Sequence, residues 1–390
     1  MKILQMFDLF NPVVGKGTVI LLHGLCKALA ERGHQVTLYT SDFELDPEYA
    51  DSIPEVEVRA FRCASRFAGF YVMPDMVKEA RKGLGEFDVI HTHCFRSFQN
   101  IVIHHYAKKY GIPYIVDTHG SLPRRTYERR GLKWLLKVLF DTAFGNRILQ
   151  DAHKVIAETQ TGIREYREAG VDGDRIELIT PPFDTKQFEQ LPPHGQFKER
   201  HGIDGKIVLF LGRINKIKGL DFLVHSFHSL TEVRSDTRLI IVGNDEGYKV
   251  TLDKLIDRLD LTDKVMFTGF LSGVEKLSAL VDANVLAQTS IYEHGTRAPF
   301  EAILCDTPII VTKNTSASEN VKKIDAGYLV EYGNKNELRD AMQYVLDHPT
   351  EAKLKTEKAK KYIKANLSLA KGVEKYEQLY ADCLAARRTN

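Results

Sequence analysis

Residues 2–40 read KILQMFDLFNPVVGKGTVILLHGLCKALAERGHQVTLYT, and this stretch decides the fold. Its first six residues suit an apolar β-strand, residues 13–17 predict a glycine-rich turn, and residues 34–40 predict a second strand. Thr18 is the expected N-cap of a helix between the strands. Apolar residues then recur at helical spacing, namely Leu21, Leu22, Leu25, Ala28 and Leu29. Strand, helix and strand in this order form a βαβ unit, whose strands pair in parallel.

The same alternation continues through the first half of the chain and then restarts. Short strands, most of them rich in β-branched residues, are expected at 87–93, 113–119, 153–159 and 175–180. A second series is expected at 206–212, 238–243, 264–270, 283–290 and 307–312, with a helix at 219–230. Repeated βα alternation predicts parallel sheets covered by helices on both faces. The predicted fold class is α/β, with two Rossmann-like doubly wound domains.

Residues 180–195, TPPFDTKQFEQLPPHG, separate the two series. Their prolines disfavour the interiors of helices and strands, so this segment is expected to link two domains. We expect a first domain over 1–185 and a second over 186–369, with an amphipathic helix at about 370–390 packing back on the first. In open α/β sheets ligands bind outside the carboxyl ends of the strands. The active site is therefore expected at those ends, in a cleft between facing domains.

Composition excludes several broad classes of function. The chain has 390 residues, of which 43% are apolar and 27% are charged, as in a globular protein. A net charge of +2 does not favour nucleic acid as a partner. No apolar run approaches a membrane span, and the first residues suit a strand better than a signal peptide. The five cysteines are scattered without a CxxC pair, which favours a reducing cytoplasm.

Two glutamates in the stretch SIYEHGTRAPFEAILCDTPIIVT suggest chemistry, because Glu293 and Glu301 are only eight positions apart. We expect a strand to end by about Ser290 and a helix to start near Pro299, with Glu301 in its first turn. The N–H groups of the loop and of the first helical turn then lack partners, which suits a phosphate. The alternative is a solvated Glu293 and a simple helix-start charge at Glu301.

Two cations follow the first strand of the second series, in the stretch FLGRINKIKGLDFL. Arg213 and Lys218 flank a short loop before the helix at 219–230. Guanidinium and ammonium groups both bind phosphate oxygens. A solvated surface pair would need no explanation, but this position after a buried strand, at the expected ligand edge, indicates a functional role.

These motifs resemble those of the family-four retaining glycosyltransferases of GT-B fold. GRINKIKG (212–219) is similar to their Arg-x4-Lys signature, and EHGTRAPFE (293–301) is similar to their Glu-x7-Glu signature. Other segments follow the family's order over most of the chain, namely RGHQVTLYT, FDVIHTH, DTHGS, LITPPFDTKQF, IVGNDEG and KVMFTGF.

The resemblance implies roles for four residues of the second domain. Arg213 and Lys218 are expected to hold the donor diphosphate and to offset charge on the leaving group. Glu293 is expected to contact the transferred sugar near its reacting face. Glu301 is expected to bind the ribose hydroxyls.

The resemblance also implies contacts from five further residues. Backbone N–H groups around Thr296 and Arg297 are expected to bind phosphate or sugar. His119, in DTHGS, is expected to hydrogen-bond the donor sugar and to complete the catalytic set. Gly15 and Gly17 are expected to approach the diphosphate from the first domain.

The implied reaction is the transfer of a sugar from a nucleotide-diphosphate sugar to an acceptor hydroxyl with retention of configuration. The acceptor is expected to be a glycan or a lipid-linked acceptor, in the assembly of a lipid-linked glycan or a polysaccharide. Same-face attack requires no enzymic nucleophile, and no metal or cofactor is expected. Asp172-Gly173-Asp174 is similar to a metal-binding DxD, but its position between a helix and a strand favours turn chemistry.

Several residues depart from the family pattern. His294 stands where glycine is usual, and Arg297 stands where an apolar residue is usual. Arg297 is therefore a hypothetical third cation at the phosphates. In the linker, Pro182-Phe183 replaces the usual Asn-Gly.

Two further stretches have an open interpretation. His91 and His93 end a strand, where hydrogen-bonded core histidines are expected more often than ligands. Residues 124–140, RRTYERRGLKWLLKVLF, combine basic residues with Trp134 and an aliphatic face. Such a helix suits the anionic inner face of a membrane, although a core-facing amphipathic helix is the alternative.

Two other functions compete with glycosyl transfer. A nicotinamide-dependent oxidoreductase is one alternative, because a strand, the sequence GKG and a helix open the chain and Asp42 ends the second strand. The dinucleotide-binding fingerprint also requires a third glycine near Ile20, and this glycine is absent. A non-catalytic nucleotide-sugar-binding protein of the same fold is the other alternative.

Overall fold

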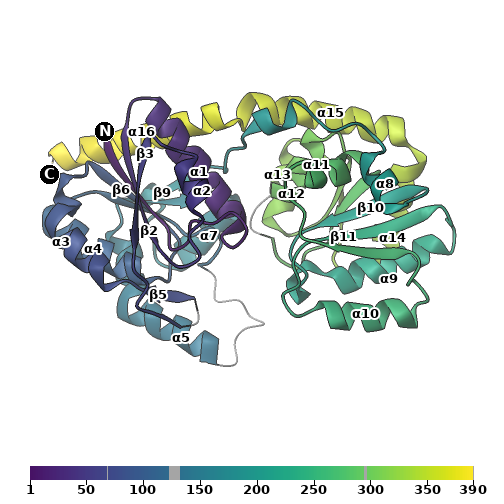
Figure 1. Cartoon of the computed structure of the whole chain (residues 1–390), viewed down its shortest axis with the longest axis horizontal. Helices are drawn as coiled ribbons and strands as arrows, with labels where there is room; N and C mark the ends of the chain where they lie inside the picture. The colour runs from purple at the N-terminus through teal and green to yellow at the C-terminus, as the bar shows by residue number, and fades with distance from the viewer. Residues whose placement is uncertain (68, 123–131, 294–296, 390) are drawn as a thin grey trace. The chain divides into compact units, whose positions relative to one another are not determined.

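The computed structural model describes residues 1–67, 69–122, 132–293 and 297–389, and the chain divides into two compact units. One unit comprises Met1–Asp184 and Leu367–Asn390, and the other comprises Thr185–Asn366. Each unit is built around its own parallel sheet (Figure 1). The boundary after Asp184 falls inside the proline-rich segment.

The first unit contains a seven-stranded parallel sheet of order β3-β2-β1-β6-β7-β8-β9. Its strands are β1 (Lys2–Met6), β2 (Gln35–Ser41), β3 (Val56–Phe61), β6 (Val89–His93), β7 (Tyr114–Asp117), β8 (Lys154–Ala157) and β9 (Ile176–Leu178). A separate antiparallel hairpin pairs β4 (Ser65–Phe67) with β5 (Phe70–Val72). The described helices are α1 (Lys16–Glu31), α2 (Pro47–Asp51), α3 (Pro74–Gly83), α4 (Phe98–Tyr110), α5 (Leu132–Phe140), the π-helical turn η3 (Asp141–Gly145), α6 (Asn146–Asp151), α7 (Gln160–Glu168) and α16 (Leu369–Thr389).

Alternation along the strands divides this unit into two cores, because successive side chains point to opposite faces of the sheet. On β1, Leu4 and Met6 enter a core with α3, α4 and α6, whereas Ile3 enters a second core with α1 and α16. The C-terminal helix supplies this second core with Val373, Tyr376, Leu379, Tyr380 and Cys383. Helix α16 is therefore a structural part of the first unit (Figure 1).

The second unit contains a six-stranded parallel sheet of order β12-β11-β10-β13-β14-β15. Its strands are β10 (Lys206–Leu211), β11 (Thr237–Val242), β12 (Val265–Gly269), β13 (Val285–Gln288), β14 (Ile309–Thr312) and β15 (Tyr328–Val330). Its described α-helices are α8 (Gln196–His201), α9 (Leu220–Thr231), α10 (Lys249–Arg258), α11 (Gly273–Asp282), α12 (Arg297–Leu304), α13 (Ser316–Lys323), α14 (Lys335–Asp347) and α15 (Pro349–Asn366).

Helices cover both faces of the second sheet. Val208 and Phe210 of β10 enter a core with α9, α10 and α14, and α11, α12 and α13 lie on the opposite face (Figure 1). The nearly continuous apolar run of β10 reflects this double coverage. The two parallel α/β sheets predicted from the sequence are thus confirmed.

Local predictions were less accurate than the fold class. Helix α1 begins at Lys16 with Gly15 as its N-cap, so Thr18 is not the cap, and Gly17 lies in the helix rather than in a turn. The edge strands β3 and β15 were not predicted. Both strands lie at an edge of their sheet, where one side of the strand is open to solvent. Exposed and half-buried residues therefore interrupt the apolar pattern of β3, and this hides it in the sequence.

The close approach of β10 and β11 at their carboxyl ends requires a glycine. Gly243 has φ +148°, and a Cβ there would lie 1.8 Å from the carbonyl oxygen of Gly212. We expect Gly243→Ala to lower the free energy of unfolding by about 3 kcal/mol through strain and overlap. Gly247 is the matched control, because it also has positive φ but a Cβ there meets nothing within 4 Å. Chemical denaturation of both variants is the measurement, and equal losses would contradict the crowding argument.

Candidate functional site

Loops from three neighbouring strands meet at the carboxyl edge of the second sheet. Strand β10 lies between β11 and β13, so the segments that follow these strands are adjacent. The loop after β10 pairs with the loop after β11, since Ile214 N–H donates to Asn244 O at 2.8 Å and Glu246 N–H donates to Ile214 O at 3.0 Å. This arrangement brings charged residues that are distant in sequence to one edge.

Gly219 fixes the position of Lys218. Gly219 has φ +62°, and a Cβ there would lie 2.2 Å from Thr289 O, so no larger residue fits without a shift. The Thr289 hydroxyl donates to the carbonyl oxygens of Lys218 and Gly219, both at 3.2 Å. The loop after β10 is therefore held against the end of β13.

Lys218 and Glu293 form a mostly buried ion pair. The Lys218 ammonium donates to Glu293 Oε2 at 2.5 Å, and the same oxygen accepts from Ser290 Oγ at 2.9 Å and Gln288 Nε2 at 3.2 Å. Burial opposes ionisation of Glu293, but the ammonium and the hydrogen bonds outweigh it and lower the pKa. Glu293 is therefore an ionised carboxylate that orients the ammonium.

Arg213 forms a second ion pair at the same edge. Its guanidinium donates to the two carboxylate oxygens of Glu246 at 3.2 and 3.0 Å, and Asn215 donates to the same carboxylate at 2.9 Å. The Arg213 side chain is 45% exposed, so this contact is accessible to a competing anion.

Glu301 forms the third group of charges. Its carboxylate is buried and contacts the Lys276 ammonium at 3.0 Å and the Arg297 guanidinium at 3.3 Å. Helix α12 begins at Arg297, so Glu301 lies in its second turn. The prediction that Glu301 lies in the first turn was therefore wrong. Thr296 and His294 lie outside the described residues.

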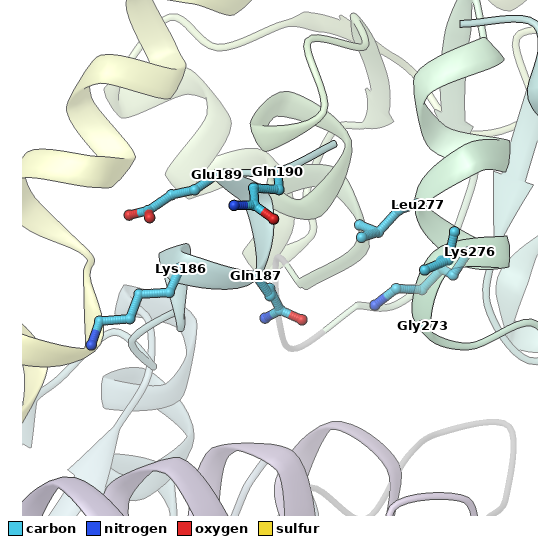
Figure 2. A pocket seen from close by; sticks show the side chains of 8 residues that line it. Lys186, Gln187, Glu189, Gln190, Gly273, Lys276 and Leu277 are labelled. Atoms are coloured by element: carbon cyan, nitrogen blue, oxygen red, sulfur yellow. The ribbon is translucent and has the colours of Figure 1, made fainter. Parts of the chain in front are cut away.

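A pocket of about 430 Å³ adjoins this third group. Figure 2 shows Gln187 and Lys276 pointing toward each other across it, whereas Lys186 points away. The lining comes from the segment that starts the second unit and from α11, namely Lys186, Gln187, Glu189, Gln190, Gly273, Val274, Lys276 and Leu277. The volume is within the range of small-molecule sites. Lys276 connects the pocket to Glu301.

In the first unit, His119 follows β7 with φ +44°. Its Nδ1 is 2.8 Å from Glu158 Oε1 and its Nε2 is 3.0 Å from His93 Nδ1. Burial lowers the pKa of His119, but the carboxylates of Asp117 and Glu158 outweigh it and raise the pKa to about 9. Within the described ranges, these three are the one group whose ligand atoms are close enough to hold a metal ion. The cationic imidazole neutralises one of the two carboxylates.

The prediction that His91 and His93 are hydrogen-bonded core histidines is confirmed. Both are buried, with His91 Nδ1 2.8 Å from the Tyr380 hydroxyl and His93 Nε2 2.7 Å from Gln5 Oε1.

Helix α5 does not bury all of its apolar face. Phe140 packs against the first core, but Leu132, Leu135 and Leu139 are 63%, 46% and 55% exposed. The basic residues Arg124, Arg125, Arg129 and Arg130 precede α5 and lie outside the described residues. Among the helices that the structure describes, none is both long and apolar enough to span a bilayer.

The structure brings some predicted site residues together and adds others. Lys218 contacts Glu293, and Arg297 contacts Glu301. Arg213 contacts neither glutamate named from the sequence. His119, Gly15 and Gly17 belong to the first unit. Sequence reasoning missed Glu246, Asn215 and Lys276, although the position of Glu246 directly after a buried strand was a usable signal.

Two family descriptions match most of the chain. The description "Glycosyltransferase Family 4" matches residues 15–187, and "Glycosyl transferases group 1" matches residues 195–366. The N-acetyl-alpha-D-glucosaminyl L-malate synthase of Bacillus anthracis is 25% identical over 96% of this chain and 95% of its own. The mannosylfructose-phosphate synthase of Agrobacterium fabrum is 25% identical over 76% of this chain and 71% of its own.

Solved structures agree on the fold. Anabaena Alr3699/HepE, crystallised with UDP and glucose, superposes with a TM-score of 0.79 at 19% identity, covering 98% of this chain and 100% of its own. The fold and the site define a nucleotide-sugar glycosyltransferase of GT-B architecture. The chain belongs to glycosyltransferase family 4, a retaining family.

Glu246 competes with an incoming diphosphate for Arg213. We expect Glu246→Gln to tighten UDP binding by up to about fivefold, the worth of a surface ion pair. Titration calorimetry with UDP measures the change. Asp253→Asn is the matched control. Asp253 forms a comparable exposed ion pair with Lys249 on α10, and its substitution by Asn removes the same negative charge as Glu246→Gln. Equal changes in both variants would mean that only net charge matters.

Proposed function

We propose that this enzyme transfers a hexosyl group from a UDP-sugar to an acceptor hydroxyl with retention and without a metal ion. The observation that carries the proposal is the set of cations at the carboxyl edge of the second sheet. Lys218 is mostly buried and oriented by Glu293, and Arg213 is accessible beside it in the same loop. Two such cations stabilise a leaving diphosphate in the way that a divalent metal does elsewhere.

The donor class is supported by the comparisons. Anabaena Alr3699/HepE was crystallised with UDP, with UDP and glucose, and with UDP-glucose. The names of the two curated relatives describe products that contain a mannosyl and an N-acetylglucosaminyl group. We infer a UDP-hexose donor from these proteins together with the cation set.

The pocket beside Lys276 is the proposed nucleoside site. Glu301 is the proposed ribose ligand, and Lys276 contacts both Glu301 and the pocket. Arg297 is the proposed third cation at the phosphates. The backbone N–H groups of Thr296 and Arg297 are proposed to bind phosphate or sugar. In the first unit, Gly15, Gly17 and His119 are assigned the donor contacts implied by the family resemblance.

In the proposed reaction the bond between the sugar C1 and the diphosphate oxygen breaks. A bond from C1 to the acceptor oxygen forms on the same face, and the acceptor's proton passes to the departing phosphate oxygen. Arg213 and Lys218 offset the negative charge on the diphosphate. Glu293 Oε2 is committed to Lys218, Ser290 and Gln288, which supports a positioning role toward the sugar rather than a nucleophilic one.

The proposal is tested by incubating the protein with UDP-, GDP- and ADP-hexoses and measuring nucleoside diphosphate release. We expect release from a UDP-hexose, with Arg213→Ala and Lys218→Ala each lowering kcat/KM by about 100-fold. Lys249→Ala is the control, because the ion pair of Lys249 is formed along its own helix with Asp253. Binding without release for every donor would favour a non-catalytic binding protein. Family membership already excludes the oxidoreductase alternative.

We further propose that α5 docks on the anionic cytoplasmic face of a membrane, where a lipid-linked glycan would be the acceptor. The exposed leucines Leu132, Leu135 and Leu139 recur at three- and four-residue spacing and form one apolar stripe. Phe144 extends this exposed apolar surface and is 44% exposed. The basic sequence before α5 complements anionic lipid.

Vesicles of phosphatidylglycerol test this docking. We expect the protein to co-sediment in low salt, and Leu135→Glu with Leu139→Glu to weaken the binding by at least tenfold, because each buried leucine contributes about 2 kcal/mol. Leu354→Glu is the control, since Leu354 is 62% exposed on α15. Equal binding by all variants, or none by the unmodified protein, would remove the membrane role.

A further inference from the structure

The sheet of the first unit has a topological switch point between β1 and β6. From β1 the chain passes through α1 to β2 on one side, whereas from β6 it passes through α4 to β7 on the other side. Helix α1 packs on one face of the sheet and α4 on the opposite face. In open α/β sheets, ligands bind outside the carboxyl ends of the strands at such a point. The residues that follow β1 and β6 are therefore placed to meet a ligand.

Asp8 lies at this switch point, directly after β1. Its carbonyl oxygen accepts from the N–H group and the hydroxyl group of Ser41, at 3.4 and 2.6 Å, so its backbone is held against the end of β2. Burial and then the negative charge of Asp8 raise the pKa of the Cys94 thiol well above its ordinary value, so Asp8 is also near the loop after β6. Cys94 itself has φ +109°, a strained value of the kind that clusters at ligand sites.

The carboxyl group of Asp8 has no partner in the described part of the chain. Asp8 is only 5% exposed, yet none of the described residues forms a hydrogen bond or an ion pair with its side chain. Of the two carboxyl oxygens only Oδ1 is completely buried, so Oδ2 is open to a ligand. A buried carboxyl group without a partner costs free energy of folding. Such a group is a candidate for function, since a ligand can supply the partner that the fold omits.

The protonation of Asp8 indicates which ligand group it suits. Burial raises its pKa to about 8, so the carboxyl group is mostly protonated at neutral pH. It then offers one O–H donor and acceptor lone pairs. A ligand hydroxyl group, which also both donates and accepts, matches this pattern. A phosphate or a carboxylate instead requires a cation beside it, and an ammonium group only donates.

Two aromatic side chains adjoin the carboxyl group. Burial raises the pKa of Tyr71 on β5, Arg66 lowers it and Asp8 raises it further, so this phenol is near Asp8. The half-buried Phe43 packs on Tyr71 with the ring centroids 5.5 Å apart, and the Arg66 guanidinium lies over the Phe43 ring at 4.4 Å. Small-molecule sites combine aromatic walls with a few polar groups. A sugar ring, which has apolar C–H faces and hydroxyl groups, suits these surroundings.

We propose that Asp8 is an acceptor-binding residue, which exchanges hydrogen bonds with one hydroxyl group of an uncharged sugar ring in the acceptor. The inference rests on the proposed function, because the acceptor is defined by the transfer reaction. It adds the chemical class of the acceptor at this point, a hydroxylated ring without a charge. It leaves the donor contacts proposed for Gly15, Gly17 and His119 as they are.

Two variants of Asp8 and one control test the proposal in the full-length protein. Asp8→Leu removes every hydrogen-bonding atom, whereas Asp8→Asn keeps a donor and an acceptor on a side chain of the same shape. Gln99→Met is the matched control, because Gln99 in the first turn of α4 is also buried, with no described partner for either amide atom. Both amide atoms of Gln99 are completely buried, so they are closed to a ligand.

The binding of uncharged sugars is measured by titration calorimetry in the presence of UDP. The probes are the methyl glycosides of glucose, galactose, mannose and N-acetylglucosamine. For the glycoside that binds best, we expect Asp8→Leu to weaken binding by about tenfold or more, the worth of one hydrogen bond to such a group. Asp8→Asn should stay within about threefold of the unmodified protein, and Gln99→Met should bind equally. An Asp8→Asn protein as weak as Asp8→Leu would overturn the proposed hydrogen-bond exchange.

Monodeoxy forms of the same glycoside identify the hydroxyl group. One of them should bind the unmodified protein about tenfold more weakly and show no further loss in Asp8→Leu, because both changes remove the same hydrogen bond. Losses that add in Asp8→Leu for every deoxy sugar would overturn the inference.

Chemical denaturation separates a role in binding from a role in folding. Asp8→Leu and Gln99→Met should each be at least as stable as the unmodified protein, since each removes a buried polar group without a partner. A less stable Asp8→Leu protein, equal losses of binding in the control, or binding of no glycoside overturns the inference. Sugar binding that depends on Asp8, in a protein that releases no UDP from any UDP-hexose, supports the inference and overturns the proposed function. Acceptor-stimulated UDP release that is unchanged in Asp8→Leu does the reverse.

Discussion

The ion pair between Lys218 and Glu293 is the interaction on which the candidate site depends. An ammonium held in a mostly buried position is stable only beside a compensating carboxylate, and Glu293 is further held by Ser290 and Gln288. The pair therefore fixes both charges before any ligand arrives. An anion that binds there meets a preorganised cation, and the protein does not have to reorganise at the moment of reaction.

The backbone makes this preorganisation possible. The loops after β10, β11 and β13 approach one another so closely that Gly219 and Gly243 have no room for a side chain. The same crowding sets the order of charges along the edge, with Arg213 toward β11 and Lys218 toward β13. Each cation is balanced by a carboxylate from the neighbouring loop, so the edge is close to neutral while its cations remain available.

The sequence was sufficient for the fold class and for the cation and carboxylate motifs, because both leave strong local patterns. Buried parallel strands such as β10 are apolar throughout, and Arg213, Lys218, Glu293 and Glu301 follow such strands at recognisable spacing. The pairing of these residues was not predictable. Lys276 contributes through tertiary contact, and no local pattern distinguishes it from surface charges, whereas Glu246 at least follows a buried strand. Similarly, Gln5 and Tyr380 are 375 positions apart, and only the packing of α16 on β1 brings them together.

The contribution of α16 to the first unit has a consequence for the order of folding. Residues 1–184 leave the ribosome long before residues 367–389, yet one face of their sheet is completed by Val373, Tyr376 and Tyr380. During synthesis of the whole intervening unit, this sheet face is covered by α1 but lacks the residues that α16 supplies. The core of the first unit is therefore completed only after translation of the C-terminal helix, and until then the nascent unit exposes apolar surface.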